Sequence, residues 1–317
     1  MIFCQMENLN AIKKRIKSVN DISQMTNAMQ LVSGAKMRRS MQMHDSVHPF
    51  FSLCAESMQE IIKNTDELDN PFFELNQKTE GETWKIACFV LSGDQGLAGA
   101  YNNNMVKITE EHIRGKILEN TRKGISTEYK LYVFGKLARE KLIRNGFNVD
   151  TEFSFPISEP TFFRARSVSS IIKQKFLQNE FDLVYLIYTK MESMSKMVPV
   201  VVRLAPVDLK SLKEIMPRDV DDAGLAMEKG GKVEYDPNAN EVFGFLIDTY
   251  LNAIIYGAMV DAYASEQTAR LTAMDNATSN ADEMMKKLLL ISNRARQAKI
   301  TNELTEIING AQQADNL

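Results

Sequence analysis

The sequence has few of the residues that end helices and strands or that form disulfide cross-links. Eight prolines, fifteen glycines and three cysteines are spread over 317 residues. Cys4, Cys54 and Cys88 are far apart and form no Cys-x-x-Cys pair, so we expect a reducing compartment and no disulfide framework. Three histidines offer little material for general-base catalysis. His44 and His48 stand four apart, but a metal site needs a third ligand that the sequence does not supply.

Long apolar runs and strong net charge are missing as well. No apolar run approaches 18 residues, so we expect no membrane span. The first ten residues, MIFCQMENLN, lack a basic segment followed by an apolar core, which argues against a signal peptide. The net charge of −3 predicts no bulk attraction to nucleic acid.

No motif for nucleotide chemistry is complete. Ser92–Gly99 (SGDQGLAG) follows an apolar run but matches neither GxGxxG nor a Walker A loop. A tight strand-to-helix turn explains these glycines better than a phosphate site does. Asp221 and Asp222 are adjacent on a polar stretch, where carboxylates are usually just solvated. We therefore expect no cofactor and no direct nucleotide binding.

What the sequence does contain is helix-forming sequence at both ends. Residues 238–313 hold no proline and predict a helix on the order of 110 Å long, at about 1.5 Å per residue. Steps of four and three predict a left-handed coiled-coil seam with a second helix. The expected seam residues are Ala277, Ala281, Met284, Leu288, Ile291, Ala295 and Ala298.

Residues 8–64 predict the partner helix. Its apolar stripe runs through Ile12, Ile16, Val19, Ile22, Met25, Met29 and Val32. Pro49 is expected to kink or break this helix. Its cations are opposed in that span only by Asp21; they are Lys13, Lys14, Arg15, Lys17, Lys36, Arg38 and Arg39. This basic face is either simply solvated or meets an acidic partner. Nucleic acid is disfavoured because no aromatic residues interleave with the cations.

Between the two long helices, the spacing of apolar residues changes from a helical period to continuous apolar runs typical of buried strands. Apolar strands are expected at 84–91, 131–134, 181–188 and 197–204, with helices at 102–120, 136–145 and 162–179. This alternation predicts an α/β layer with a largely parallel sheet. The expected fold class is α/β plus a long antiparallel two-helix coiled coil. We divide the chain into 1–83, the α/β domain 84–206, a linker 207–237 and the last helix, 238–317.

Motifs at both ends carry a resemblance to a known family, the gamma subunits of F-type ATP synthases. Residues 12–19 (IKKRIKSV), 22–29 (ISQMTNAM) and 32–39 (VSGAKMRR) resemble the family's first helix. Residues 264–270 (ASEQTAR), 274–281 (MDNATSNA) and 293–304 (NRARQAKITNEL) resemble its last helix. The loop 91–102 is similar to the family's glycine-rich turn.

The resemblance implies a non-catalytic rotor shaft that mechanically couples proton flow to ATP synthesis or hydrolysis. The implied partners are a ring of alpha and beta subunits, the epsilon subunit and the membrane ring of c subunits. The implied location is the cytoplasmic face of a bacterial plasma membrane. Carried over by position, the contacts to beta subunits are Arg296, Gln297, Thr301, Met29, Lys36 and Arg38.

Two other classes remain open at this stage. A nucleotide-dependent α/β enzyme would need a phosphate loop and catalytic side chains, and the sequence offers neither. A free-standing coiled-coil adaptor would share the helices, but it would have no reason to carry the motifs at the two ends.

Overall fold

The computed structural model describes most of the chain. The described residues are 9–64, 70–73, 77–153, 155, 159–193, 196–207, 236 and 238–314. They fall into two compact units, one drawn from Met1–Ser33 and Arg270–Leu317, the other from Gly34–Ala269. We call them the coil unit and the sheet unit. The expected linker, 207–237, lies outside the described residues apart from Val207 and Asp236.

Two long helices contribute to both units. Helix α1 spans Leu9–Asn64 and helix α6 spans Ala239–Ala314, close to the expected bounds. Pro49 lies inside α1 and does not end it, so of the expected kink or break, the break is wrong. A proline removes one backbone hydrogen bond, and the remaining bonds of a 56-residue helix continue on both sides.

In the coil unit α1 and α6 pack against each other in antiparallel directions. Val19 forms a buried cluster with Ala281 and Leu288, and Ile16 and Met285 pack against it. The direction follows from hydrogen bonds further along: Ser23 Oγ donates to Asp282 Oδ1 at 3.2 Å, and Gln30 Nε2 to Asp275 Oδ1 at 2.8 Å. As the numbers rise on α1, they fall on α6.

The seam of α1 turns polar after Val19. The buried or half-buried positions at steps of four and three are Ile12, Ile16, Val19, Ser23, Thr26, Gln30 and Ser33. Ile22, Met25 and Val32, which the apolar stripe placed in the seam, are exposed. The hydroxyls of Thr26 and Thr278 lie 2.8 Å apart instead. Small polar side chains fill these positions because they bond across a close helix pair.

The sheet unit is built on a mixed four-stranded sheet. Its strands are β1 (Thr83–Leu91), β2 (Ser126–Phe134), β3 (Leu183–Ser193) and β4 (Lys196–Ala205). Their order is β2-β1-β3-β4. Strand β1 is parallel to β2 and β3, with Phe89 opposite Tyr132 and Leu186, whereas β4 is antiparallel to β3. The β3–β4 hairpin makes the sheet mixed rather than wholly parallel.

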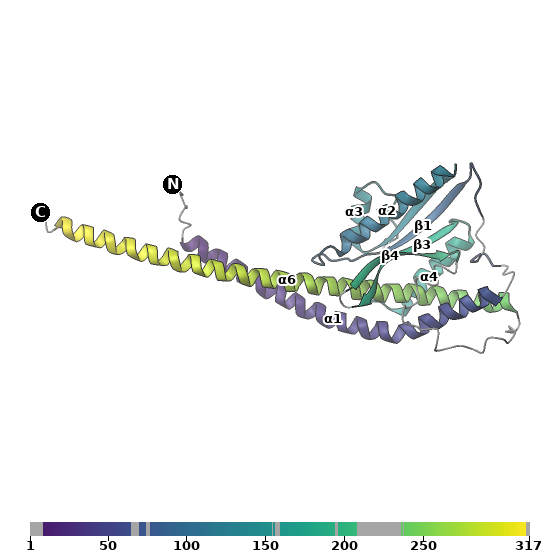
Figure 1. Cartoon of the computed structure of the whole chain (residues 1–317), viewed down its shortest axis with the longest axis horizontal. Coiled ribbons are helices and arrows are strands. Elements are labelled where there is room, and N and C mark those ends of the chain that lie inside the picture. The colour runs from purple at the N-terminus through teal and green to yellow at the C-terminus, as the bar shows by residue number, and fades with distance from the viewer. Residues whose placement is uncertain are drawn as a thin grey trace. The chain divides into compact units, whose positions relative to one another are not determined.

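Helices cover both faces of this sheet (Figure 1). Side chains alternate along a strand, so Ile86, Cys88 and Val90 face one side and Ala87 and Phe89 the other. Helices α2 (Tyr101–Arg122) and α3 (Lys136–Arg144) pack on the first face. Helix α4 (Phe162–Leu177), with the sheet-unit parts of α1 and α6, packs on the second.

Helix α6 is long and apolar enough, by length and composition alone, to cross a membrane. Half of its most apolar stretch is buried within the protein. Phe243, Ile247, Leu251 and Ile254 belong to the core cluster on the second face of the sheet. This packing accounts for the apolar character of the part of α6 that lies in the sheet unit.

Candidate functional site

The end of α6 is an uncovered helical surface. Arg296, Gln297 and Thr301 are all exposed, and every residue from Lys299 to Asn309 is exposed as well. The Thr301 hydroxyl donates to the Gln297 carbonyl at 3.0 Å, a bond within the helix itself. Within the described part of the chain, Arg296 makes no ion pair. The end of α6 therefore presents polar and charged side chains that the rest of the described chain leaves exposed.

Two residues of the expected α6 seam are exposed. Ala281 and Leu288 are buried, and Ala277 and Ala295 are half-buried. Met284 and Ile291 are each 45 % exposed, so these two expectations are corrected. The observed seam is Met274, Thr278, Ala281, Met285, Leu288, Ser292 and Ala295. A search for apolar residues passed over Thr278 and Ser292, which keep the heptad steps in register.

The predicted contacts on α1 lie elsewhere. Met29 is half-buried, next to the Gln30 that bonds to Asp275. Arg296 lies roughly 30 Å further along α6, at about 1.5 Å per residue. Lys36 and Arg38 are exposed and belong to the sheet unit. Within the coil unit the structure therefore gives two separate patches, not one site.

The glycine loop after β1 is held by structural hydrogen bonds. Gly93 N–H donates to Asn102 Oδ1 at 2.8 Å, and Ser92 Oγ donates to the Phe134 carbonyl at 2.6 Å. A methyl group on Gly93 would lie 2.7 Å from Glu266 Oε1. Close approach to a side chain of α6 thus explains Gly93, whereas Gly99 has the positive φ, 55°, that a tight turn favours.

The carboxyl ends of β1 and β2 are where an open α/β sheet usually binds ligands. Asp94 Oδ1 accepts from the Lys136 N–H at 3.0 Å, at the start of α3. An acidic side chain there opposes a phosphate, which would need the same N–H groups. In the neighbouring hollow, of about 440 Å³, Lys141 Nζ already donates to Asn103 Oδ1 at 2.8 Å.

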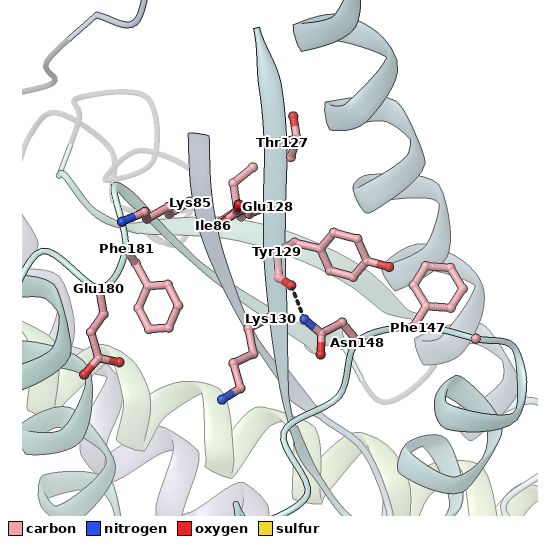
Figure 2. Close-up of a pocket in the computed structure, with 11 residues that line it drawn as sticks. Lys85, Ile86, Thr127, Glu128, Tyr129, Lys130, Phe147, Asn148, Glu180 and Phe181 are labelled. Atoms are coloured by element: carbon pink, nitrogen blue, oxygen red, sulfur yellow. Dashed lines mark hydrogen bonds between the residues drawn. The ribbon is translucent and has the colours of Figure 1, made fainter. Parts of the chain in front are cut away.

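A larger cavity, of about 670 Å³, lies at the opposite, amino ends of β1 and β2 (Figure 2). Its charged lining is mixed, with Lys85 and Lys130 beside Glu128 and Glu180. Asn148 Nδ2 donates to the Tyr129 carbonyl at 2.9 Å, the bond drawn in Figure 2. Because positive and negative groups alternate, the cavity has no preference for a phosphate.

A buried polar stretch of α6 was missed by sequence reasoning. Asp261, Ser265 and Glu266 are at most 8 % exposed, although they follow an apolar segment. His44 Nε2 on α1 lies 3.3 Å from Asp261 Oδ1. Burial raises the pKa of Asp261 to about 7, although His44, Lys190 and a hydrogen bond from Met191 N–H each lower it. The available signal was the polar ASEQ sequence after an apolar helix.

Metal binding at His44 gains no support. The described residues include no group of three or more histidine, cysteine, aspartate or glutamate side chains placed to hold an ion. The His48 side chain lies outside the described part of the chain. His44 instead faces the Asp261 carboxyl.

Comparison with known proteins decides the family. The ATP synthase family model matches residues 8–313. The ATP synthase gamma chain of Ruminiclostridium cellulolyticum is 39 % identical over 304 residues, covering 96 % of this chain and 98 % of the relative. The chain belongs to the ATP synthase gamma chain family. This gamma chain is a non-catalytic subunit of the enzyme and forms its central stalk, the rotor.

Two further comparisons bear on its setting. A gamma chain from Acetobacterium woodii, named as sodium ion specific, is 35 % identical and covers 96 % of this chain and 98 % of the relative. A solved chain of the Euglena gracilis mitochondrial ATP synthase, in an OSCP/F1/c-ring structure, shares the fold. Its TM-score is 0.59 at 15 % identity, covering 96 % of this chain and 93 % of that chain. The gamma chain described here is a subunit of a bacterial, membrane-associated F1 complex.

Family membership removes the two alternatives. A free-standing adaptor would not match the gamma chain over residues 8–313, and an α/β enzyme would not match its two long helices.

Proposed function

We propose that this gamma subunit couples ion flow to catalysis by turning its paired helices inside a ring of alpha and beta subunits. The observation that carries the proposal is the uncovered end of α6, from Lys299 to Asn309. Its exposed apolar residues include Ile300, Leu304 and Ile307. A helix with such a surface needs a partner, because large exposed apolar areas mark interaction sites.

The contacts we assign to beta subunits are those of the resemblance. Arg296, Gln297 and Thr301 would meet an acidic loop of one beta subunit, and an arginine fork pairs bidentately with carboxylates. Met29, Lys36 and Arg38 would form a second set on α1. Exposed Ile22 and Met25, close to Met29 in sequence, support contact along this helix as well.

The remaining partners are proposed at the sheet unit. The α/β domain, 84–206, would meet the epsilon subunit and the c-subunit ring at the cytoplasmic face of a bacterial plasma membrane. Segments 1–83 and 238–317 would form the shaft, and 207–237 a linker. Nucleotides would bind the ring subunits, and nucleic acid would have no part in the function.

The coupling ion is proposed to be the proton. The gamma chain carries no ion path of its own in this proposal, and one relative is named as sodium ion specific. ATP synthesis by the complete enzyme, driven by a proton gradient in sodium-free buffer, distinguishes the two ions.

The contact assignment is tested by replacing Arg296 and Gln297 with alanine. Both side chains are exposed, so the isolated chain should unfold at the parent's denaturant concentration. Assembled with alpha and beta subunits, the double variant should hydrolyse ATP more slowly and be held less tightly. Lys286→Ala removes another exposed cation from α6 and serves as the matched control.

The outcomes separate the parts of the proposal. Normal assembly and normal ATP hydrolysis by the double variant would reject the contact assignment. If the parent chain itself failed to assemble with alpha and beta subunits, the rotor proposal would fall with it.

A further inference from the structure

The buried polar stretch Asp261–Glu266 of α6 contacts α1, α2, β3 and the glycine loop after β1. On α6 itself it follows a long apolar segment that packs on the sheet. Burying a polar side chain is costly unless it finds partners, so each contact here stabilises one particular arrangement.

Four elements of the sheet unit meet this stretch. From α1, His44 Nε2 lies 3.3 Å from Asp261 Oδ1. From α2, the Tyr101 hydroxyl donates to the Ala262 carbonyl at 3.0 Å. At β3, the Ser265 hydroxyl donates to the Thr189 carbonyl at 3.3 Å, and the Met191 N–H bonds to Asp261. In the glycine loop, Gly93 lies against the Glu266 carboxylate.

Apolar packing and polar bonding resist motion differently. The hydrophobic effect is non-directional, so an apolar helix face can turn a little over a sheet without losing its burial. A hydrogen bond weakens steeply as its angle departs from linearity. Turning α6 by one residue, about 100°, would remove all of these contacts at once. The polar stretch therefore sets the rotational angle of α6 against the sheet.

We propose that Asp261, Ser265 and Glu266 are positioning residues that lock α6 to the sheet unit, so that rotation of the sheet unit is passed to the helix. The proposal rests on the rotor function above and adds the place where torque enters α6. We call the stretch Asp261–Glu266 with its partners the polar lock. It also accounts for the glycine loop, which here supports a helix rather than a phosphate.

The test uses the complete ATP synthase in liposomes, with the double variant Tyr101→Phe and Ser265→Ala. Both changes remove a hydroxyl and keep most of the side chain's volume. The matched control is Thr109→Val, which removes a buried hydroxyl. Among the described residues, that hydroxyl bonds only to the Met105 carbonyl of its own helix. The readouts are the rate of ATP hydrolysis and the number of ions pumped per ATP hydrolysed.

If α6 turns against the sheet unit in the double variant, ATP hydrolysis and ion pumping should no longer change together. We expect the double variant to hydrolyse ATP near the parent rate and to pump severalfold fewer ions per ATP. The control should keep the parent ratio even where its unfolding free energy falls equally. A merely structural role would reduce the amount of assembled enzyme without changing the ratio.

An unchanged ratio in the double variant, or an equal fall in the control, overturns the polar lock. If the double variant does not assemble, Ser265→Ala alone is measured by the same criteria. Failure of the parent enzyme to couple hydrolysis to pumping would reject the rotor function instead, so the two failures are distinct.

Discussion

At the scale of single residues, two glycines of one loop differ in what a side chain would meet. A methyl group on Gly93 would lie 2.7 Å from Glu266 Oε1 and 3.2 Å from Asn102 Oδ1, whereas nothing lies within 4 Å of one on Gly96. Glu266 is 4 % exposed and has little room to move away. The loop's composition alone does not distinguish these glycines; their neighbours in space do.

Gly93→Ala should therefore lower the free energy of unfolding by about 1–3 kcal/mol, the usual range for overpacking. Gly96→Ala is the control and should stay within about 0.5 kcal/mol of the parent, as for most open surface positions. Urea unfolding of both variants gives the comparison. Equal stabilities would show that Glu266 moves aside, and the close contact would carry no constraint.

Asp261 makes stability depend on pH. Its folded pKa is about 7, against 3.8 in the unfolded chain, so the folded state binds an extra proton between these values. Stability from this group is present below about pH 4 and is lost as the pH rises through 7. The titratable groups facing it are His44 and, from β3, Lys190. Asp45 Oδ1 lies 3.4 Å from His44 Nδ1, on the other side of the ring.

Asp261→Asn removes this titration. Burial lowers the pKa of His112 to about 4, which makes stability rise with pH over nearly the same range. His112 is present in both proteins, so its effect cancels in the difference between parent and variant. We expect the parent's stability relative to the variant to fall between pH 4 and 7, measured by urea unfolding at each pH. A difference that does not change with pH would mean that Asp261 titrates normally.

At the scale of elements, periodicity predicted the helices and strands well and the seam less well. Both long helices appear close to their expected bounds, and all four strands appear, because long apolar periods report secondary structure directly. Strand β2 begins at Ser126 rather than at 131, and β3 ends at Ser193 rather than at 188. The α1 seam was misassigned after Val19, since Ser23, Thr26 and Ser33 carry it while Ile22 and Met25 face outward. A sequence does not distinguish an apolar residue that faces outward, toward a proposed partner, from one that is buried in the seam.

The same limit applied to the candidate site. Arg296 and Gln297 were found through a resemblance of motifs, and no rule of helix formation would single them out. The polar lock escaped notice because His44 and Asp261 are far apart in sequence. Only the antiparallel pairing of α1 with α6 brings them within 3.3 Å.

The seam register can be checked with two phenylalanine substitutions on α6. Ala281 is 7 % exposed and packs with Val19, so Ala281→Phe should overpack the helix pair and cost about 1–3 kcal/mol. Met284→Phe, at a position 45 % exposed, should change stability by less than about 0.5 kcal/mol. The denaturation midpoint of each variant is compared with the parent's. A larger loss at Met284 than at Ala281 would restore the register expected from apolar residues alone.

At the scale of the whole molecule, the sheet unit and the coil unit differ in how much apolar side chain they bury. The sheet unit has apolar clusters on both faces of its sheet, whereas the coil unit has one small cluster around Val19, Ala281 and Leu288. Most stability of the isolated chain must come from the sheet unit, because buried apolar area is the dominant favourable term in folding. The coil unit instead keeps apolar and basic side chains on its surface, as the proposed contacts with a ring of alpha and beta subunits need.

This division predicts the effect of ending the chain after Ala298. Every described residue removed is exposed as far as Asn309, so little burial is lost and the isolated protein should melt at nearly the parent temperature. In the assembled enzyme the same deletion removes Thr301 and the apolar surface of Ile300 and Leu304. ATP hydrolysis should fall without being abolished, because the proposed contacts of Arg296 and of α1 remain. Melting of the isolated chain and ATP hydrolysis by the assembly are measured on one preparation. A large drop in melting temperature would mean that the end of α6 supports the fold itself, and parent-level hydrolysis would mean that the ring does not use this surface.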